Sequence, residues 1–170
     1  MSTRHAVVDT TLGPITIVAT RRAITGLYFA QHIRRPGRDT FGPRVPMLAD
    51  QLLADAGRQL IEYLDGSRRT FDLPLEAAGD AFQKSVWAIV SEIPFGRTTT
   101  YGAISGELGD RSLAQEVGQA VAMNPLCILV PCHRVVGANG ALTGYAGGLT
   151  RKRALLELEE PAAAPAGRLF

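Results

Sequence analysis

The chain has little of what usually marks a specialised protein. Two cysteines, Cys127 and Cys132, are too few for a disulfide framework. No segment approaches the roughly 18–20 apolar residues that span a bilayer, and the N-terminus has no apolar stretch of the signal-peptide kind. The net charge of +2 indicates no nucleic-acid partner by itself, so any basic surface must be local. We expect a soluble, cytoplasmic protein.

The composition that remains is ordinary for a globular protein, with 46% hydrophobic and 20% charged residues in a chain of 170. That length suits one compact domain or two small lobes. We expect a first lobe over residues 1–78, a second lobe over 79–160 and a flexible tail over 161–170. Basic residues cluster in the loop 31–46 and at 151–153, where a solvated surface and a phosphate contact are both open.

The first lobe shows strand patterns followed by one helical pattern. Short β-branched runs broken by Gly and Pro over residues 5–29 predict hairpins. Apolar residues at helical spacing from Leu48 to Leu64 predict a helix over 47–64. The segment 71–75 is predicted to be extended.

The second lobe begins with Asp80 and Gln83, which resemble a capping box and predict a helix. Two short helices are predicted at about 101–107 and 112–122, with Ser112 as the N-cap of the second. This is a helix-turn-helix pattern, although two ordinary packed helices would give the same signal. The second helix is poor in Arg and Lys, which favours a minor-groove contact over base reading in the major groove.

Chemistry is concentrated around Cys132, which follows Pro131 and precedes His133 in the segment 128–140. A neighbouring base lowers the cost of ionising a thiol and makes it nucleophilic. Neighbours in an extended segment point in opposite directions, so a bridging water or a kinked backbone is needed to connect the two side chains. A buried structural thiol is the alternative.

The last helix is predicted to run from Thr150, its cap, to Pro161. Glu159 falls in the final turn and the basic residues 151–153 in the first turn, and the helix dipole disfavours both placements. These departures indicate partners outside the helix, an imidazole for Glu159 and phosphates for the basic trio. Plain surface charge is the alternative.

Several motifs together resemble one family, the O6-alkylguanine-DNA alkyltransferases or methylated-DNA–protein-cysteine methyltransferases. The match is nearly continuous from about 80 to 160 and loose before that. It is carried by Phe82-Gln83-x-x-Val86-Trp87, Ile93-Pro94-x-Gly96-x-x-x-x-Tyr101-Gly102, Asn124-Pro125, Pro131-Cys132-His133-Arg134-Val135 and Gly144-Tyr145-Ala146-Gly147-Gly148. The resemblance implies an α/β protein with a ribonuclease-H-like N-terminal lobe. Its C-terminal lobe would be mainly helical and winged-helix-like, with a helix-turn-helix.

The resemblance also implies roles for single residues. Cys132 would accept the alkyl group, His133 would act on the thiol through a water, and Glu159 would orient His133. Asn124 would brace the turn beneath the cysteine, and Tyr101 would donate its hydroxyl proton toward the base. The thioether that forms would end the reaction after one turnover.

Double-stranded DNA containing alkylated guanine is the implied partner, with alkylated thymine left open, and the base would be flipped out through the minor groove. The implied DNA- and base-contacting positions are Tyr101, Gly102, Gln115, Val135, Ala138, Tyr145 and Ala146. Gln115 departs from the family, which usually has arginine there, so base flipping should be less supported unless Arg111 compensates. We expect no cofactor, no metal, and a monomer whose cooperativity on DNA is left open.

Three alternatives differ in what happens at the cysteine. A non-catalytic module that binds alkylguanine and recruits other repair factors would not need Cys132. A transcription factor triggered by methylation usually has a further sensing domain. A cysteine hydrolase would turn over repeatedly, and counting products per protein would reveal it.

Overall fold

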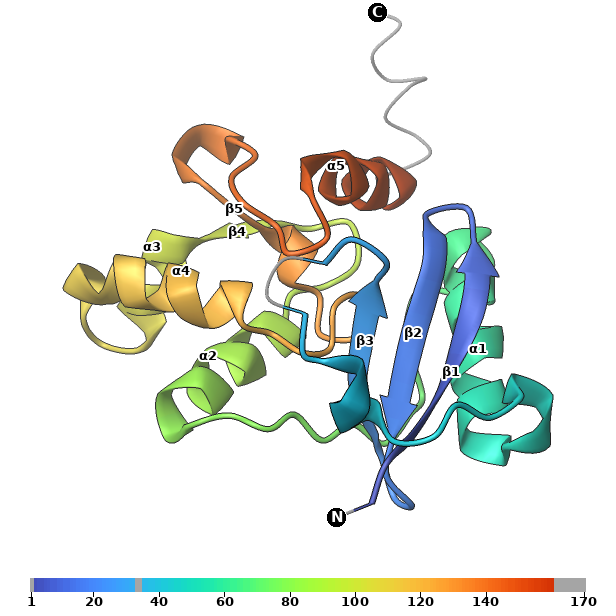
Figure 1. The fold of residues 1–170 in the computed structure, drawn as a ribbon. Coiled ribbons are helices and arrows are strands. Elements are labelled where there is room, and N and C mark those ends of the chain that lie inside the picture. The colour runs from blue at the N-terminus through green and yellow to red at the C-terminus, as the bar shows by residue number, and fades with distance from the viewer. Residues whose placement is uncertain (1, 33–34, 161–170) are drawn as a thin grey trace, which may run out of the picture.

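The structure is a computed structural model that describes residues 2–32 and 35–160 (Figure 1). The tail predicted at 161–170 lies outside the described residues. The first half of the chain contains β1 (Arg4–Thr10), β2 (Gly13–Ala19), β3 (Ile24–Phe29), 3-10 turns at Arg38–Phe41 and Met47–Ala49, and α1 (Gln51–Leu64). The second half contains α2 (Ala81–Ser91), β4 (Thr99–Thr100), α3 (Tyr101–Glu107), a 3-10 turn at Arg111–Leu113, α4 (Ala114–Ala122), a 3-10 turn at Cys132–Arg134, β5 (Val135–Val136), a 3-10 turn at Ala138–Gly140, and α5 (Leu149–Leu158).

The predicted hairpins are confirmed as an antiparallel sheet in the order β1-β2-β3. The central strand β2 is buried from Ile15 to Ala19 because it has a neighbour on each side and α1 packs against one face (Figure 1). Its β-branched residues suit this position, where the pleated surface is packed. The sheet and α1 form the first layer pair of the molecule.

The helix predicted over 47–64 begins later, at Gln51, and buries Ala56 and Leu60 of the predicted apolar face together with neighbouring residues. Asp50 caps it by accepting from the backbone N–H of Leu53 at 3.0 Å. Leu48 belongs to the preceding 3-10 turn and is 92% exposed, so its predicted place on the buried face is wrong. Leu53 and Tyr63 are buried instead, and Tyr63 thereby points toward the second half of the chain.

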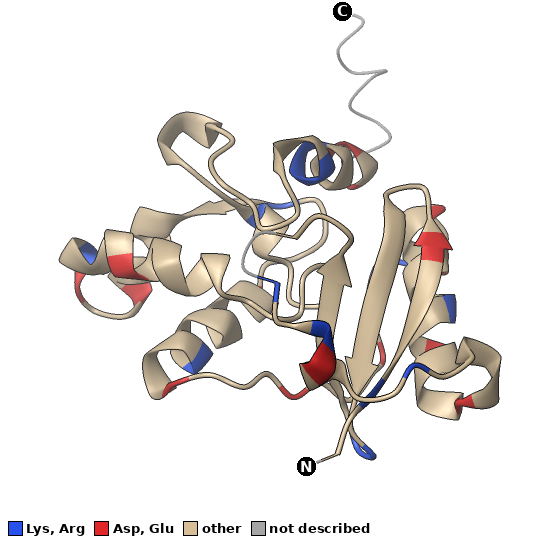
Figure 2. Cartoon of the chain, viewed as in Figure 1, with Lys and Arg blue, Asp and Glu red and all other residues tan. Residues whose placement is uncertain are grey.

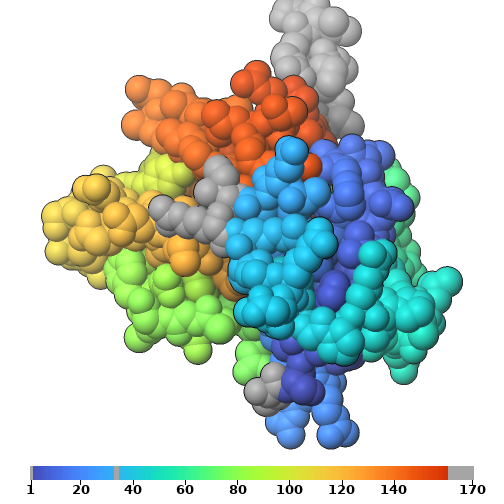
Figure 3. Space-filling view, in the orientation of Figure 1, coloured from blue at the N-terminus to red at the C-terminus, as the bar shows by residue number. Residues whose placement is uncertain are grey.

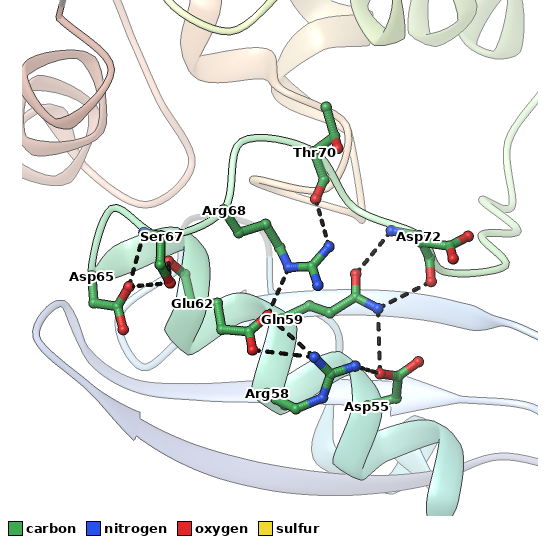
Figure 4. A network of polar contacts seen from close by, with 9 residues as sticks. All are labelled: Asp55, Arg58, Gln59, Glu62, Asp65, Ser67, Arg68, Thr70 and Asp72. Atoms are coloured by element: carbon green, nitrogen blue, oxygen red, sulfur yellow. Dashed lines mark hydrogen bonds and ion pairs between the residues drawn. The ribbon is translucent and has the colours of Figure 1, made fainter.

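A polar network holds the end of α1 to the loop that follows (Figure 4). The buried amide of Gln59 pairs with the backbone of Asp72, accepting from its N–H at 2.8 Å and donating to its carbonyl at 3.1 Å. On the exposed side, Glu62 accepts from Arg58 and from Arg68. The network fixes the last two turns of α1 relative to the loop.

The second half continues the edge of the sheet. The backbone N–H of Leu27 in β3 donates to Pro125 at 2.8 Å, and Leu27 forms a parallel bridge with Leu126. In Figure 3 the blue atoms of the first half meet the orange atoms of the C-terminal segment. Pro125 and Leu126 are therefore anchored on the sheet edge, shortly before the Cys132 turn.

Helices α2, α3 and α4 pack together in the part of the molecule that lies beyond β3, opposite β1 (Figure 1). The capping box at α2 is confirmed. The Asp80 carboxylate accepts from the backbone N–H of Gln83 at 2.7 Å, and the side-chain oxygen of Gln83 accepts from the backbone N–H of Asp80 at 3.0 Å. The helix-turn-helix is present as α3 and α4. Ser112 was wrongly predicted to cap α4, because residues 111–113 form a 3-10 turn whose own cap is Asp110.

Charge is scattered over both halves in the view of Figure 2, with blue and red segments interspersed. This agrees with the small net charge and leaves short-range contacts to define any nucleic-acid surface. Among the described residues, no helix has the length and apolar character needed to cross a membrane.

Candidate functional site

Cys132 opens a 3-10 turn that directly follows Pro131 and ends before β5. Its side chain is 4% exposed and lines a cavity of about 250 Å³. The other lining residues are Tyr101, Gly118, Val121, Ala122, Gly144, Tyr145 and Ala146. The turn gives the kinked backbone that, besides a bridging water, was one of the two ways expected to connect Cys132 with His133.

An acid–base network lies on the other side of the same turn. His133 Nε2 is 2.8 Å from Glu159 Oε2, which confirms the predicted imidazole partner of Glu159. Arg134 binds both oxygens of this carboxylate, through Nε and Nη2, each at 2.8 Å. Tyr63 donates to Oε2 at 2.5 Å, and the N–H of Gly96 reaches Oε1 at 3.4 Å. His133 is fully buried and Glu159 is 2% exposed.

These contacts set the charges of the pair. Burial alone would raise the pKa of Glu159, but hydrogen bonds from His133 and Arg134 outweigh it and hold the pKa at about 2. Burial lowers the pKa of His133, Glu159 opposes this, and the charges of Arg134 and Lys152 add to the lowering. The resting state therefore combines a carboxylate with a neutral imidazole.

The tautomer of that imidazole follows from its partners. Nε2 faces an ionised carboxylate and therefore carries the proton, which leaves Nδ1 as the basic nitrogen. Nδ1 is buried and has no hydrogen-bond partner among the protein groups described. The structure gives no direct hydrogen bond between the His133 ring and the Cys132 thiol, so a proton would pass between them through a bridging molecule such as water.

Cys132 lies beside a second thiol. Its Sγ is 3.9 Å from Sγ of Cys127, and both cysteines are buried. The contact with Cys127 is the main cause that lowers the pKa of Cys132; burial opposes it, while Asn124 and the charge of Lys152 add to the lowering. The same contact, followed by burial, raises the pKa of Cys127 well above its usual value. Of the two sulfurs, Cys132 is the one whose pKa is lowered and the one that lines the cavity.

Asn124 organises the segment that leads to the cysteine. Its side-chain amide donates to the carbonyl of Val130 at 2.9 Å and accepts from the N–H of Leu126 at 2.9 Å. Asn124 is 2% exposed, so both bonds are shielded from water. These contacts close a loop from residue 124 to residue 130 and place the Cys132 turn at its end.

Lys152 points into the protein, so the phosphate contact predicted for the basic trio at 151–153 is wrong for this residue. It is fully buried, and its ammonium donates to the carbonyls of Val135 at 2.7 Å and Thr143 at 3.0 Å, with Gly144 at 3.4 Å. Arg151 is likewise engaged within the protein, with its guanidinium over the Phe29 ring at 4.8 Å. Of the trio, Arg153 is the exposed residue.

The start of α5 also differs from the prediction that Thr150 caps it. The helix begins at Leu149, and its N-cap is Gly148 with φ +91°, a backbone conformation that favours glycine. The preceding residue, Gly147, packs so closely that a Cβ there would lie 2.5 Å from the Phe29 ring. Gly148 thus takes the place of a side-chain cap, and Gly147 allows the chain to pass close to the Phe29 ring.

The predicted base-contacting residues divide into three sets: residues that line the cavity, the buried Val135, and residues outside the cavity. Tyr101, Tyr145 and Ala146 line the cavity with Cys132, and the Tyr101 hydroxyl lies 2.9 Å from Thr143 Oγ1. Val135 does not line the cavity: it is buried, pairs with Thr99 in the β4–β5 sheet and gives its carbonyl to Lys152. A further group, exposed or half-buried, lies near the helix-turn-helix and the loop after β5: Gly102, Gln115 and Ala138.

Sequence reasoning missed two members of the network, Tyr63 and Arg134. Arg134 belongs to the motif around Cys132, so its position beside His133 was a usable signal. Tyr63 lies 96 residues from Glu159 in the chain, and nothing in its local pattern separates it from a core tyrosine. Among residues 2–32 and 35–160, no group of three or more metal-binding side chains is arranged to hold an ion.

The fold and the site define a class of protein: a mixed α/β sheet lobe beside a helix-turn-helix lobe, with a buried cysteine between a cavity and a His–Glu pair. Comparison with known proteins agrees. Residues 3–77 match the family model described as 6-O-methylguanine DNA methyltransferase, ribonuclease-like domain, and residues 81–161 match its DNA binding domain. The chain belongs to the 6-O-methylguanine DNA methyltransferase family.

Relatives cover nearly the whole chain. The methylated-DNA–protein-cysteine methyltransferase of Mycobacterium bovis is 40% identical over 156 residues, which is 92% of each chain. The crystal structure of the Mycobacterium tuberculosis O6-methylguanine methyltransferase superimposes with a TM-score of 0.83 at 38% identity, covering 97% of this chain and 99% of that one. A structure of the M. tuberculosis protein in complex with DNA gives a TM-score of 0.80 at 38% identity, covering 95% and 97%.

Proposed function

We propose that this protein repairs DNA by transferring the alkyl group of O6-alkylguanine irreversibly to the sulfur of Cys132. One observation carries the proposal: the Cys132 turn presents the thiol to a cavity on one side and joins a His133–Glu159 pair on the other. Relatives named methylated-DNA–protein-cysteine methyltransferase support it.

The chemistry follows from the charges around the turn. The proton of the Cys132 thiol passes through a water to Nδ1 of His133, and Glu159 stabilises the imidazolium that forms. The thiolate attacks the alkyl carbon, a sulfur–carbon bond forms, and the carbon–O6 bond breaks with its electron pair going to the base. Overall, the base gains one proton and the cysteine becomes a thioether, which ends turnover.

The cavity residues orient the base in this proposal. Tyr101 donates its hydroxyl proton to the departing guanine and recovers a proton through solvent from the His133 imidazolium, so the base gains the thiol proton overall. Thr143, whose Oγ1 lies 2.9 Å from the Tyr101 hydroxyl, can donate to the Tyr101 oxygen during this step. Tyr145 and Ala146 form the wall that faces the base edge, with contacts from the backbone at Ala146. Asn124 holds the loop below the cysteine through its two buried hydrogen bonds.

Double-stranded DNA reaches the cavity through the helix-turn-helix, with the damaged nucleotide flipped out through the minor groove. Gly102, Gln115 and Ala138 are the proposed contacts to the DNA around the flipped base. The structure of the M. tuberculosis relative in complex with DNA supports DNA as the partner. A cytoplasmic location, a monomeric state before DNA binding, and lobes over 1–78 and 79–160 complete the proposal.

Mass spectrometry after incubation with DNA containing O6-methylguanine tests the transfer. We expect each wild-type chain to gain the mass of one methyl group, located on the peptide that contains Cys132. Cys132→Ser should gain none, whereas the matched variant Cys127→Ser should still gain one. Methylation of Cys132→Ser, or unmethylated wild-type protein that binds the lesion tightly, would refute the proposal and favour a different acceptor or a binding module.

A further inference from the structure

A residue of the first half of the chain reaches into the acid–base network. Tyr63, in the last turn of α1, is 1% exposed. Its hydroxyl is 2.5 Å from Glu159 Oε2 and 3.4 Å from His133 Nε2. These partners lie 96 and 70 residues away in the sequence. The sheet lobe thus contributes a polar group to a site otherwise built by the second half.

The position of this hydroxyl is firmly fixed. The Tyr63 ring packs against Phe71 and Phe95, at centroid distances of 5.3 and 6.3 Å. One turn earlier on the same helix, the buried Gln59 locks α1 to the backbone of Asp72 (Figure 4). A side chain held by packing and by a neighbouring network loses little entropy when it forms its hydrogen bond.

The hydroxyl acts as a donor to the carboxylate. Burial, followed by the charge of Glu159, raises the pKa of Tyr63 far above its usual value, so its proton stays on the phenol and points at Oε2. That oxygen already accepts from His133 and Arg134, each at 2.8 Å. A donor that satisfies part of the carboxylate charge leaves less of it to stabilise a proton on the imidazole.

We propose that Tyr63 is a positioning residue of the repair reaction, which shares Glu159 Oε2 with His133 and thereby keeps the imidazole neutral and ready to accept the thiol proton. Three charged groups act on the imidazole of His133. Glu159 favours its protonation, whereas Arg134 and Lys152 oppose it. All three keep their charge when the Tyr63 hydroxyl is removed, so a change in the titration of His133 would report the loss of the hydrogen bond from that hydroxyl to Glu159.

The experiment compares wild type, Tyr63→Phe and the matched control Tyr28→Phe, which removes another buried tyrosine hydroxyl of the sheet lobe. NMR titration of the histidines in the DNA-free protein reads the imidazole directly, with His5 as the internal reference. We expect the pKa of His133 to rise by about one unit in Tyr63→Phe and to stay unchanged in Tyr28→Phe. Tyr63→Met, which also lacks the hydroxyl, should give the same shift if Tyr63→Phe is poorly recovered.

Methyl-transfer rates across pH give the second readout. A base must be neutral to act, so the rise of rate with pH should move to higher pH in Tyr63→Phe. The variant should be about tenfold slower on the acid side and within about twofold of wild type on the alkaline side. An unshifted His133 titration, or a rate lowered equally at every pH, would overturn the proposal. Because the titration needs no substrate, it can succeed even if the proposed transfer reaction, on which the role rests, is wrong.

Discussion

The two sides of the Cys132 turn differ in the charge of the residues that form them. Behind it, His133, Arg134 and Glu159 form a buried charged network in which every carboxylate oxygen has at least two donors. In front of it, the cavity has walls of small or aromatic residues, among them Gly118 and Tyr145. Charge lies behind the sulfur, and an uncharged space lies before it.

This difference explains how one sulfur can be activated without a charged wall facing the substrate. A buried charge is costly unless it is paired, and here Arg134 pairs with Glu159 through two bonds of 2.8 Å. The pair still touches the imidazole, whose Nδ1 is the one basic atom left without a protein partner in the described network. The imidazole can therefore accept the proton of the Cys132 thiol, while the cavity itself stays uncharged and suits an uncharged base.

The largest effect should come from breaking the charged side. Glu159→Gln removes the carboxylate that fixes the His133 tautomer and leaves Arg134 as a buried, unpaired cation. We expect the methyl-transfer rate to fall by about 10²–10⁴-fold and the folded state to lose about 3–5 kcal/mol. Single-turnover kinetics and urea unfolding measure the two effects. A rate within about twofold of wild type would mean that the network does not activate the sulfur.

Acid should weaken the same side selectively. The pKa of Glu159 is about 2 in the folded protein and 4.5 ordinarily. The unfolded chain therefore binds this proton more tightly, and stability is lost as pH falls from about 4.5 to about 2. Two and a half units correspond to roughly 3 kcal/mol. The unfolding free energy of wild type should drop across this window, whereas Glu159→Gln should have a flatter slope; equal slopes would assign acid sensitivity to other carboxylates.

The sequence predicts the features that depend on neighbouring residues, but not the contacts between residues that are far apart along the chain. The hairpins, the α2 capping box and the two short helices follow from local patterns, and all are present. Glu159 was recognised because a carboxylate at a helix C-terminus needs an outside partner. The same rule indicated partners for Lys152 but not their identity, since three carbonyls brought together by folding replace the expected phosphate. Tyr63 could not be found, because tertiary packing alone brings it to Glu159.

Removing the Lys152 ammonium tests how firmly the Cys132 turn must be held to the segment that lines the cavity. Its bonds tie Val135, after the Cys132 turn, to Thr143 and Gly144 at the cavity. In Lys152→Met these carbonyls lose a charged donor, so we expect a loss of about 1–3 kcal/mol in unfolding free energy and about tenfold slower transfer. Lys84→Met, at an exposed position on α2, is the control and should change neither. Slower transfer at unchanged stability would show that the ammonium acts by its charge rather than as a tether.

The smallest effect is expected on the cavity side, at α4, which we propose contacts DNA. Gln115 is exposed at the start of α4, and it has less planar area than a guanidinium and no charge. Gln115→Arg should bind alkylated duplex DNA a few-fold more tightly and transfer a few-fold faster, because arginine better supports the gap left by a flipped base. Gln119→Arg, exposed one turn further along α4, adds the same charge without that position. If both variants gain affinity equally and the gain vanishes with salt, the benefit is general phosphate attraction, and Gln115 has no special place in flipping.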